Sequence, residues 1–96
     1  MHVHTVLVKL KDPTTLEQCR TVMESMRGRI DGLERLEITT NNLAGSYSCD
    51  VALTTVWADL AAYRAYERDP VHLEVRSVVL TLMSNAMTID YSMESS

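Results

Sequence analysis

The sequence predicts an α+β domain in which helices cover one face of a four-stranded antiparallel sheet. The length of 96 residues allows one domain, residues 1–96, of which 92–96 form a short tail. Hydrophobic residues make up 46% of the chain, which is enough to form a buried core. Segments with the two-residue period of strands alternate with segments that have the period of helices, in the order β-α-β-β-α-β.

The first strand and the first helix are predicted by a change of period after residue 10. Apolar side chains occupy both faces of residues 2–10, as in an interior strand. Thr14 and Glu17 have the spacing of a capping box, which predicts the start of a helix. An apolar stripe at helical spacing then runs from Leu16 to Ile30. We expect this helix to end at Asp31-Gly32, because glycine favours helix C-termini.

Two further strands are expected to form an antiparallel hairpin. Residues 33–40 and 47–57 both alternate between their two faces, and the polar stretch 41–46 between them contains a glycine. One face of the longer strand carries Tyr47, Cys49, Val51, Leu53, Thr55 and Trp57.

The last part of the chain predicts a broken helical region and a fourth strand. Asp59 is expected to cap a helix over residues 60–67, and Asp69-Pro70 interrupts it. An apolar stripe from His72 to Met83 predicts the next helix, and residues 86–91 alternate as a strand. The complete order is that of the ferredoxin-like split β-α-β fold.

One face of such a sheet has no helix to cover it. The uncovered face is either the one with Val51, Leu53 and Trp57 or the opposite face, and both carry apolar side chains. The chain has six Met, one Trp and no Phe. A small core of this kind gives little net stability, because ordering the chain costs roughly 1.5 kcal/mol per residue. We therefore expect a homodimer in which two copies pack sheet against sheet.

Charge and hydropathy exclude several classes of partner. The net charge is −4 and the basic residues are scattered, so we expect no nucleic-acid partner. The uncharged stretch over residues 78–89 is too short and too polar to cross a membrane. No basic-then-apolar leader precedes the first strand, which predicts a cytoplasmic protein. Cys19 and Cys49 are widely spaced, which favours reduced, packed thiols over a zinc site.

Five short motifs occur in the order typical of one family. They are the strand segment from His4 to Lys11, the turn Ile30–Leu33, the pair Cys49-Asp50, the segment from Tyr66 to His72, and the pair Asp90-Tyr91. Through these motifs the chain resembles the stress-responsive dimeric α/β-barrel (Dabb) domain family from about residue 2 to 91. Leu10, Cys49 and Asp69 stand where the family usually has Phe, Tyr and His.

The resemblance implies a ferredoxin-like monomer that dimerises into an α/β barrel. Most members of the family have no known activity, and at least one plant member looks like a polyketide cyclase. A cyclase needs a base that removes a proton between two carbonyl groups, and His72 is the candidate. Tyr66 could orient the imidazole or hold a substrate carbonyl oxygen, and His4 could add a second polar group to an apolar pocket. No cofactor is expected.

Structural roles remain open for each of these residues. His72 could be satisfied by a backbone carbonyl, Tyr66 could pack its ring with the hydroxyl at the surface, and His4 could pack between sheet and helix. His2 and His4 lie on one strand face, yet no carboxylate follows at a metal-binding spacing, so no metal site is expected. Two functions follow. One is a cofactor-independent cyclase or isomerase, or binder, of a small apolar polyketide-like molecule; the other is a non-catalytic, stress-associated or accessory homodimer.

Overall fold

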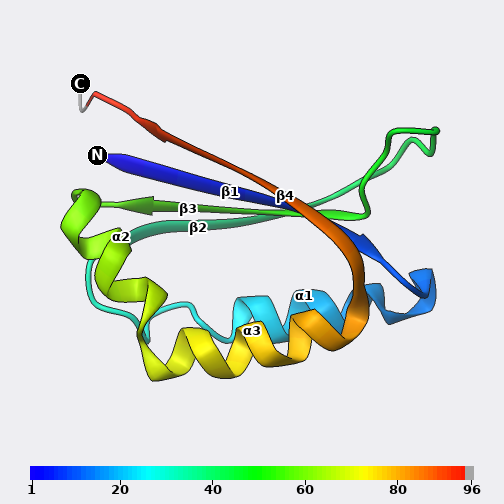
Figure 1. Ribbon diagram of the computed structural model, residues 1–96, viewed down its shortest axis with the longest axis horizontal. Coiled ribbons are helices and arrows are strands. Elements are labelled where there is room, and N and C mark those ends of the chain that lie inside the picture. The colour runs from blue at the N-terminus through cyan, green and yellow to red at the C-terminus, as the bar shows by residue number, and fades with distance from the viewer. Residues whose placement is uncertain (95–96) are drawn as a thin grey trace.

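The computed structural model describes residues 1–94 and confirms the predicted α+β architecture (Figure 1). The second helical region is divided in two by Asp69-Pro70, as expected. The elements are β1 (His2–Leu10), a 3-10 helix (Pro13–Thr15), α1 (Leu16–Glu24), β2 (Leu33–Thr40), β3 (Val51–Trp57), α2 (Leu60–Glu67), α3 (Pro70–Leu82) and β4 (Met83–Ser92).

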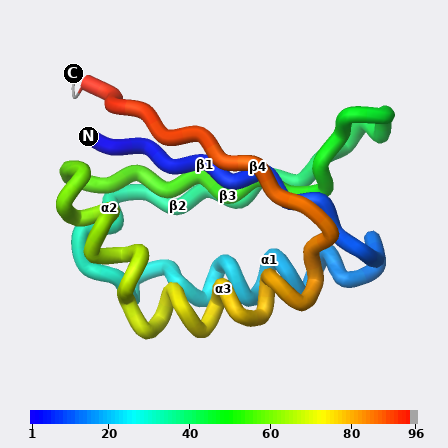
Figure 2. The backbone as a smooth tube through the Cα atoms, viewed as in Figure 1, coloured from blue at the N-terminus to red at the C-terminus, as the bar shows by residue number. Residues whose placement is uncertain are grey.

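The four strands form one antiparallel sheet with the order β2-β3-β1-β4. The helices lie together on one face of the sheet, with α1 and α3 next to each other (Figures 1 and 2). The two ends of the chain meet at one end of the sheet, where the backbone N–H of Met93 donates to the carbonyl oxygen of Met1 at 2.8 Å. This is the ferredoxin-like arrangement that the sequence predicts.

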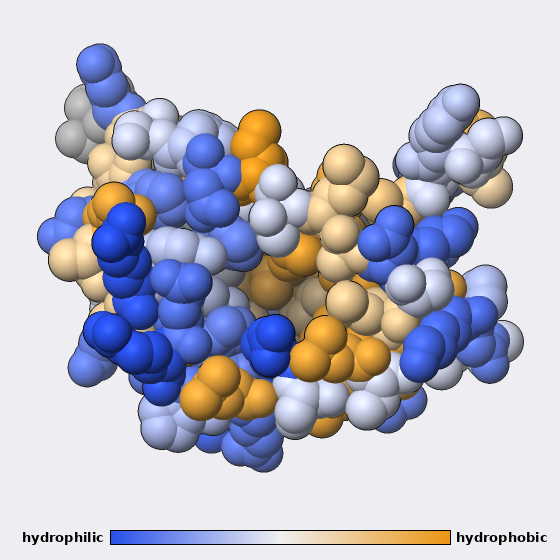
Figure 3. Space-filling model, viewed as in Figure 1, coloured by the Kyte–Doolittle hydropathy of each residue, from blue (hydrophilic) through white to orange (hydrophobic). Residues whose placement is uncertain are grey.

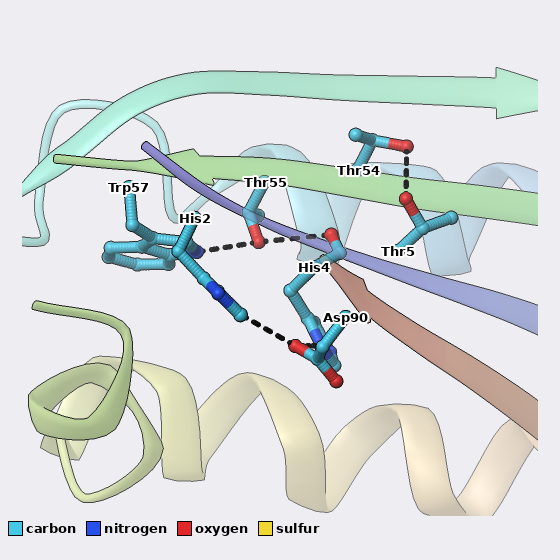
Figure 4. Close-up of polar contacts among 7 residues, drawn as sticks. All are labelled: His2, His4, Thr5, Thr54, Thr55, Trp57 and Asp90. Atoms are coloured by element: carbon cyan, nitrogen blue, oxygen red, sulfur yellow. Dashed lines mark hydrogen bonds and ion pairs between the residues drawn. The ribbon is translucent and has the colours of Figure 1, made fainter. Parts of the chain in front are cut away.

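The core lies between the sheet and the helices. From β3 it contains Val51, Leu53 and Trp57, and from the first helical region Met23 and Met26, all at most 4% exposed. The Trp57 side chain is completely buried, and its indole N–H donates to the hydroxyl of Thr55 at 2.9 Å (Figure 4). Of the two sheet faces left open by the sequence, the one with Val51, Leu53 and Trp57 therefore faces the helices.

The opposite sheet face has exposed apolar side chains, most of them on β4. Leu7 of β1 pairs with Met87 of β4, and the next position on that face pairs Thr5 with Ile89. Met87 is 68% exposed, Ile89 58% and Tyr91 47%. We call the side chains of Leu7, Met87, Ile89 and Tyr91 the outer sheet face.

Three element boundaries differ from the prediction. β3 begins at Val51 rather than at residue 47, because Asn41–Asp50 is a loop closed by a hydrogen bond from Asn41 N to Asp50 O, and Tyr47 is completely exposed. The first helix ends at Glu24, and Ile30 is buried in the irregular segment that follows it. β4 begins at Met83 rather than at residue 86, so that the pairing with β1 starts as soon as α3 ends.

The predicted capping box does not form. Asp12, rather than Thr14, caps this region, since its carboxylate accepts a hydrogen bond from Thr14 N at 2.9 Å. No side chain caps α1 itself, and Glu17 pairs with Arg20 instead of reaching back. Of the predicted tail, Ser92 belongs to β4 and residues 95–96 lie outside the described part of the chain. No helix among residues 1–94 combines the length and hydropathy needed to span a membrane.

Candidate functional site

A pocket of about 600 Å³ lies between the sheet and α3. Figure 3 shows it as a hollow with hydrophobic surface inside and beside it. Its walls are mainly apolar, and side chains from β1, α3 and β4 contribute most of them. They include Val6, Val8, Val75, Val79, Met83 and Ala86.

His4, Tyr66 and His72, the three residues proposed from the sequence, all line this pocket. They come from three different elements, namely β1, α2 and α3. The break between α2 and α3 brings the last two together: Asp69 caps α3 by accepting a hydrogen bond from Val71 N at 2.8 Å. As a result the rings of Tyr66 and His72 stack with centroids 3.9 Å apart.

His72 is held by the backbone in one tautomer. Its Nδ1 lies 3.1 Å from the carbonyl oxygen of Tyr66. Because a carbonyl can only accept, Nδ1 carries the proton, and the neutral ring keeps a lone pair on Nε2. Nε2 has no hydrogen-bond partner among residues 1–94. The backbone carbonyl considered from the sequence is therefore present, and it leaves one ring nitrogen able to accept a proton.

The surroundings of His72 favour its neutral form. Burial lowers the pKa of His72 below its ordinary value of 6.5, and the nearby Arg76 and His4 act in the same direction. The backbone of Tyr66 and Glu67 opposes this effect on the pKa of His72 without cancelling it. His72 is thus an unprotonated imidazole at neutral pH.

Tyr66 forms part of the inner wall. It is 4% exposed, so its hydroxyl is not at the surface, and burial raises its pKa well above the ordinary value of 10. The hydroxyl lies 3.9 Å from the sulfur of Met26, which is a weak acceptor. The carbonyl of Tyr66, rather than its hydroxyl, orients His72, so the hydroxyl can donate elsewhere.

His4 is oriented by a carboxylate on the neighbouring strand. It lies opposite Asp90 in the β1–β4 ladder, and its Nδ1 is 2.8 Å from Oδ1 of Asp90. His2 Nε2 is 2.9 Å from the same oxygen, so both rings point toward Asp90 on the helix side of the sheet (Figure 4). A carboxylate accepts only, so Nδ1 of His4 carries a proton and its Nε2 is the free nitrogen when the ring is neutral.

Asp90 is ionised at neutral pH. Burial raises its pKa, but the hydrogen bonds from His2 and His4, with their charges, outweigh burial and bring the pKa below the ordinary 3.8. Its side chain is 39% exposed, so solvent also stabilises the charge.

Sequence reasoning missed the roles of Asp90 and Tyr63. The Tyr63 ring lies 4.9 Å from the ring of His2 and 4.8 Å from that of His4. Burial, Asp90 and Glu67 raise the pKa of Tyr63 to about 12, so its hydroxyl stays protonated. The sequence contained a pointer to each residue. Tyr63 shares one helix face with Tyr66, and the strand order of the fold places the strand of Asp90 beside β1.

A metal site is not evident in the described chain. His2, His4 and Asp90 converge, but both rings donate to the carboxylate. Within residues 1–94 no group of three or more His, Cys, Asp or Glu side chains is arranged to hold a metal ion.

Known proteins share both the sequence pattern and the fold. Several solved structures are similar over almost all of both chains. A dimeric ferredoxin-like protein of unknown function from Thermobifida fusca has a TM-score of 0.85 at 17% identity, covering 96% of this chain and 90% of that one. A Dabb family protein from Mesorhizobium loti has a TM-score of 0.76 at 24% identity, covering 98% and 97%.

A hydroxynitrile lyase from Passiflora edulis has a TM-score of 0.83 at 11% identity, covering 99% of this chain and 94% of that one. No curated protein matches the sequence significantly. Residues 3–93 match the sequence model of the stress responsive A/B barrel domain, Dabb. The chain therefore belongs to the Dabb family.

Proposed function

We propose that this protein is a cofactor-independent enzyme of the cyclase or isomerase type, in which His72 removes a proton from a carbon next to a carbonyl group. The observation that carries the proposal is the neutral His72, with a free Nε2, in the wall of an apolar pocket of about 600 Å³. Apolar walls with a few convergent polar groups are typical of small-molecule sites. The substrate is a small, mainly apolar ketone, such as a polyketide-like compound.

The polar groups of the pocket can divide the steps of such a reaction. Nε2 of His72 accepts the proton, and the electron pair moves onto the carbonyl oxygen as an enolate. The Tyr66 hydroxyl stays protonated, and a sulfur atom is its only acceptor within residues 1–94, so it donates to that oxygen. In an isomerisation the imidazolium returns the proton to another carbon. In a cyclisation the enolate carbon attacks a second carbonyl, and the imidazolium protonates the new alkoxide.

His4 binds rather than reacts in this scheme. Asp90 fixes its ring through Nδ1, so Nε2 accepts a hydrogen bond from a hydroxyl or enol group of the substrate. The lyase from Passiflora edulis supports the idea that this fold can hold an enzyme.

Proton exchange at carbon tests the proposed base directly. The α-protons of 4-phenyl-2-butanone in deuterated buffer are followed by NMR, and the wild-type protein should accelerate their exchange beyond buffer alone. His72→Asn keeps an N–H that can donate to the Tyr66 carbonyl but lacks a basic nitrogen, so it should lower the rate about 10²-fold or more while the protein remains folded. An unchanged rate in this variant would overturn the role of His72.

The alternative function is a non-catalytic, stress-associated or accessory homodimer. It is favoured if the wild-type protein accelerates exchange of neither aryl nor alkyl ketones. The chain would then have the pocket without the reaction, and His72 and His4 would serve only packing and hydrogen bonding.

A homodimer through the outer sheet face is part of either function. The support is the exposed apolar surface of Met87, Ile89 and Tyr91, together with the dimeric state of the Thermobifida fusca protein. A stable interface would bury about 1,200 Å² or more. Ile89→Lys should produce monomers in sedimentation experiments, while Leu43→Lys, in a loop where Leu43 is 78% exposed, should leave the dimer intact. A wild-type monomer at micromolar concentration would contradict the dimer.

A further inference from the structure

Arg76 is a cation on the wall of an otherwise apolar part of the pocket. It lies on α3 one helical turn after His72, and both residues line the pocket. Leu73 and Leu80 flank it on the same side of the helix and also line the pocket, with 47% and 41% of their surfaces exposed. Arg76 therefore lies between two solvent-exposed leucines at the mouth of the pocket.

Arg76 has no internal partner in the described part of the chain. Arg20, Arg27 and Arg35 each pair with a glutamate, whereas within residues 1–94 Arg76 forms neither an ion pair nor a side-chain hydrogen bond. The charge of Arg76 nevertheless acts inside the pocket, because Arg76 is one of the groups that lower the pKa of His72.

Two carboxylates lie near the pocket, and neither neutralises Arg76. Asp90 is bonded to His2 and His4. Glu67 lines the pocket at the C-terminal end of α2 and also lines a second, shallower hollow beside Tyr63, and within residues 1–94 no ion pair joins it to Arg76. The arginine is therefore available to a ligand.

We propose that the ligand of this pocket is an apolar molecule with a carboxylate group, and that Arg76 binds this carboxylate at the pocket mouth. The proposal rests on the proposed function, because it assumes that the pocket binds a small molecule. A planar guanidinium can form two parallel hydrogen bonds to a carboxylate, and the flanking leucines contact the apolar body of the ligand and limit access of water.

The position of Arg76 also limits where the ligand reacts. One helical turn separates it from His72, about 6 Å along the helix axis. A carboxylate held by Arg76 thus places a carbon a few bonds away within reach of the base. Keto acids, with a carbonyl between the carboxylate and the apolar body, have this arrangement, and we assign them as the substrate class.

Binding of a matched pair of probes tests the assignment without any reaction. 2-Naphthoate and 2-naphthamide have the same apolar body and differ in charge, and their affinities are measured by calorimetry at pH 8 and physiological salt. The wild-type protein should bind the acid about fivefold more tightly than the amide, a modest preference because Arg76 is partly solvated. Arg76→Gln should remove this preference and leave the affinity for the amide unchanged.

Arg64→Gln is the matched control. Arg64 is exposed on α2 and lines the shallower hollow instead of the pocket, so the variant has the same net charge as Arg76→Gln and should keep the preference. Loss of the preference in this control would place the anion elsewhere and overturn the assignment. Equal affinity of the wild-type protein for the two probes, or failure of both to bind at millimolar concentration, would also overturn it.

His72→Asn separates this inference from the proposed reaction. The variant should retain the preference for the acid even though proton exchange is lost. If exchange persists in His72→Asn while the preference depends on Arg76, the proposed base is wrong and the carboxylate site stands. If exchange depends on His72 but the preference is absent, the carboxylate site is wrong and the base stands.

Discussion

Replacing Gly28 and Gly32 by alanine separates backbone strain from close packing near the site. Their φ angles are 74° and 82°, in the left-handed region that residues other than glycine rarely adopt. A Cβ at Gly28 would meet nothing within 4 Å, whereas a Cβ at Gly32 would lie 2.8 Å from the Cβ of Ala62. Ala62 belongs to α2, the helix that carries Tyr63 and Tyr66. The close approach at Gly32 therefore sets the position of one wall of the pocket.

The expected losses of stability follow from these two environments. A left-handed conformation costs alanine about 1–2 kcal/mol, partly offset because alanine restricts the unfolded chain. Gly28→Ala should therefore lower the free energy of unfolding by about 1 kcal/mol. Gly32→Ala has the same strain and adds the overlap with Ala62, which costs about 1–3 kcal/mol in a packed interior. Its total loss should be about 2–4 kcal/mol.

Urea unfolding at fixed protein concentration measures both losses. Trp57 is the only tryptophan and is completely buried, so its fluorescence reports unfolding. In the Gly32→Ala background, adding Ala62→Gly should leave the protein at least about 1 kcal/mol more stable than the sum of the two single losses predicts. In the Gly28→Ala background, the two losses should add within about 0.5 kcal/mol. Equal losses for the two glycine substitutions, or additivity in both double variants, would refute the packing argument.

Three further results are expected. Burial lowers the pKa of His72, so on acidification the unfolded chain binds a proton first. The free energy of unfolding should then fall as the pH drops through 6.5, and His72→Asn should flatten this dependence in urea titrations. Thiol reagents should modify Cys49 in the native protein but spare Cys19, which is fully buried and whose thiol pKa burial raises; equal rates would contradict this. Asp90→Asn should lower stability at pH 7 by about 1 kcal/mol in the same urea assay, since it weakens two hydrogen bonds; an unchanged midpoint would show that they are not needed.

The periodicity of the sequence predicts the elements better than their ends. The alternation in residues 51–57 correctly identifies a strand, although it leaves open which of the two faces is buried. It continues back to Tyr47, however, and nothing in a two-residue period shows where pairing to a neighbour stops. Likewise Met26 and Ile30 continue the apolar stripe after α1 has ended at Glu24, because the irregular segment still packs on the core. Burial, which the pattern reports, extends further than the regular hydrogen bonding.

The site was predictable where residues are neighbours in sequence and unpredictable where they meet across the sheet. Tyr66 and His72 flank the Asp69-Pro70 break, so their approach could be expected. The strand order of the fold places β4 beside β1, but the contact between His4 and Asp90 also depends on the exact register of the two strands, which the strand order does not fix. The sequence allowed a backbone carbonyl to hold His72 but did not identify it as that of Tyr66, because every residue supplies the same backbone oxygen.

Small side chains on the helix-facing side of β4 account for the pocket. Trp57, Met23 and Met26 fill the space between β3 and the helices. Under β4 the helix-facing residues include Ala86 and Thr88, which are too small to fill the space as far as α3, and both line the pocket. These small side chains therefore leave a cavity. The proposed dimer uses the outer sheet face and the proposed ligand uses the helix face, so a partner copy could stabilise the fold without closing the mouth beside α3.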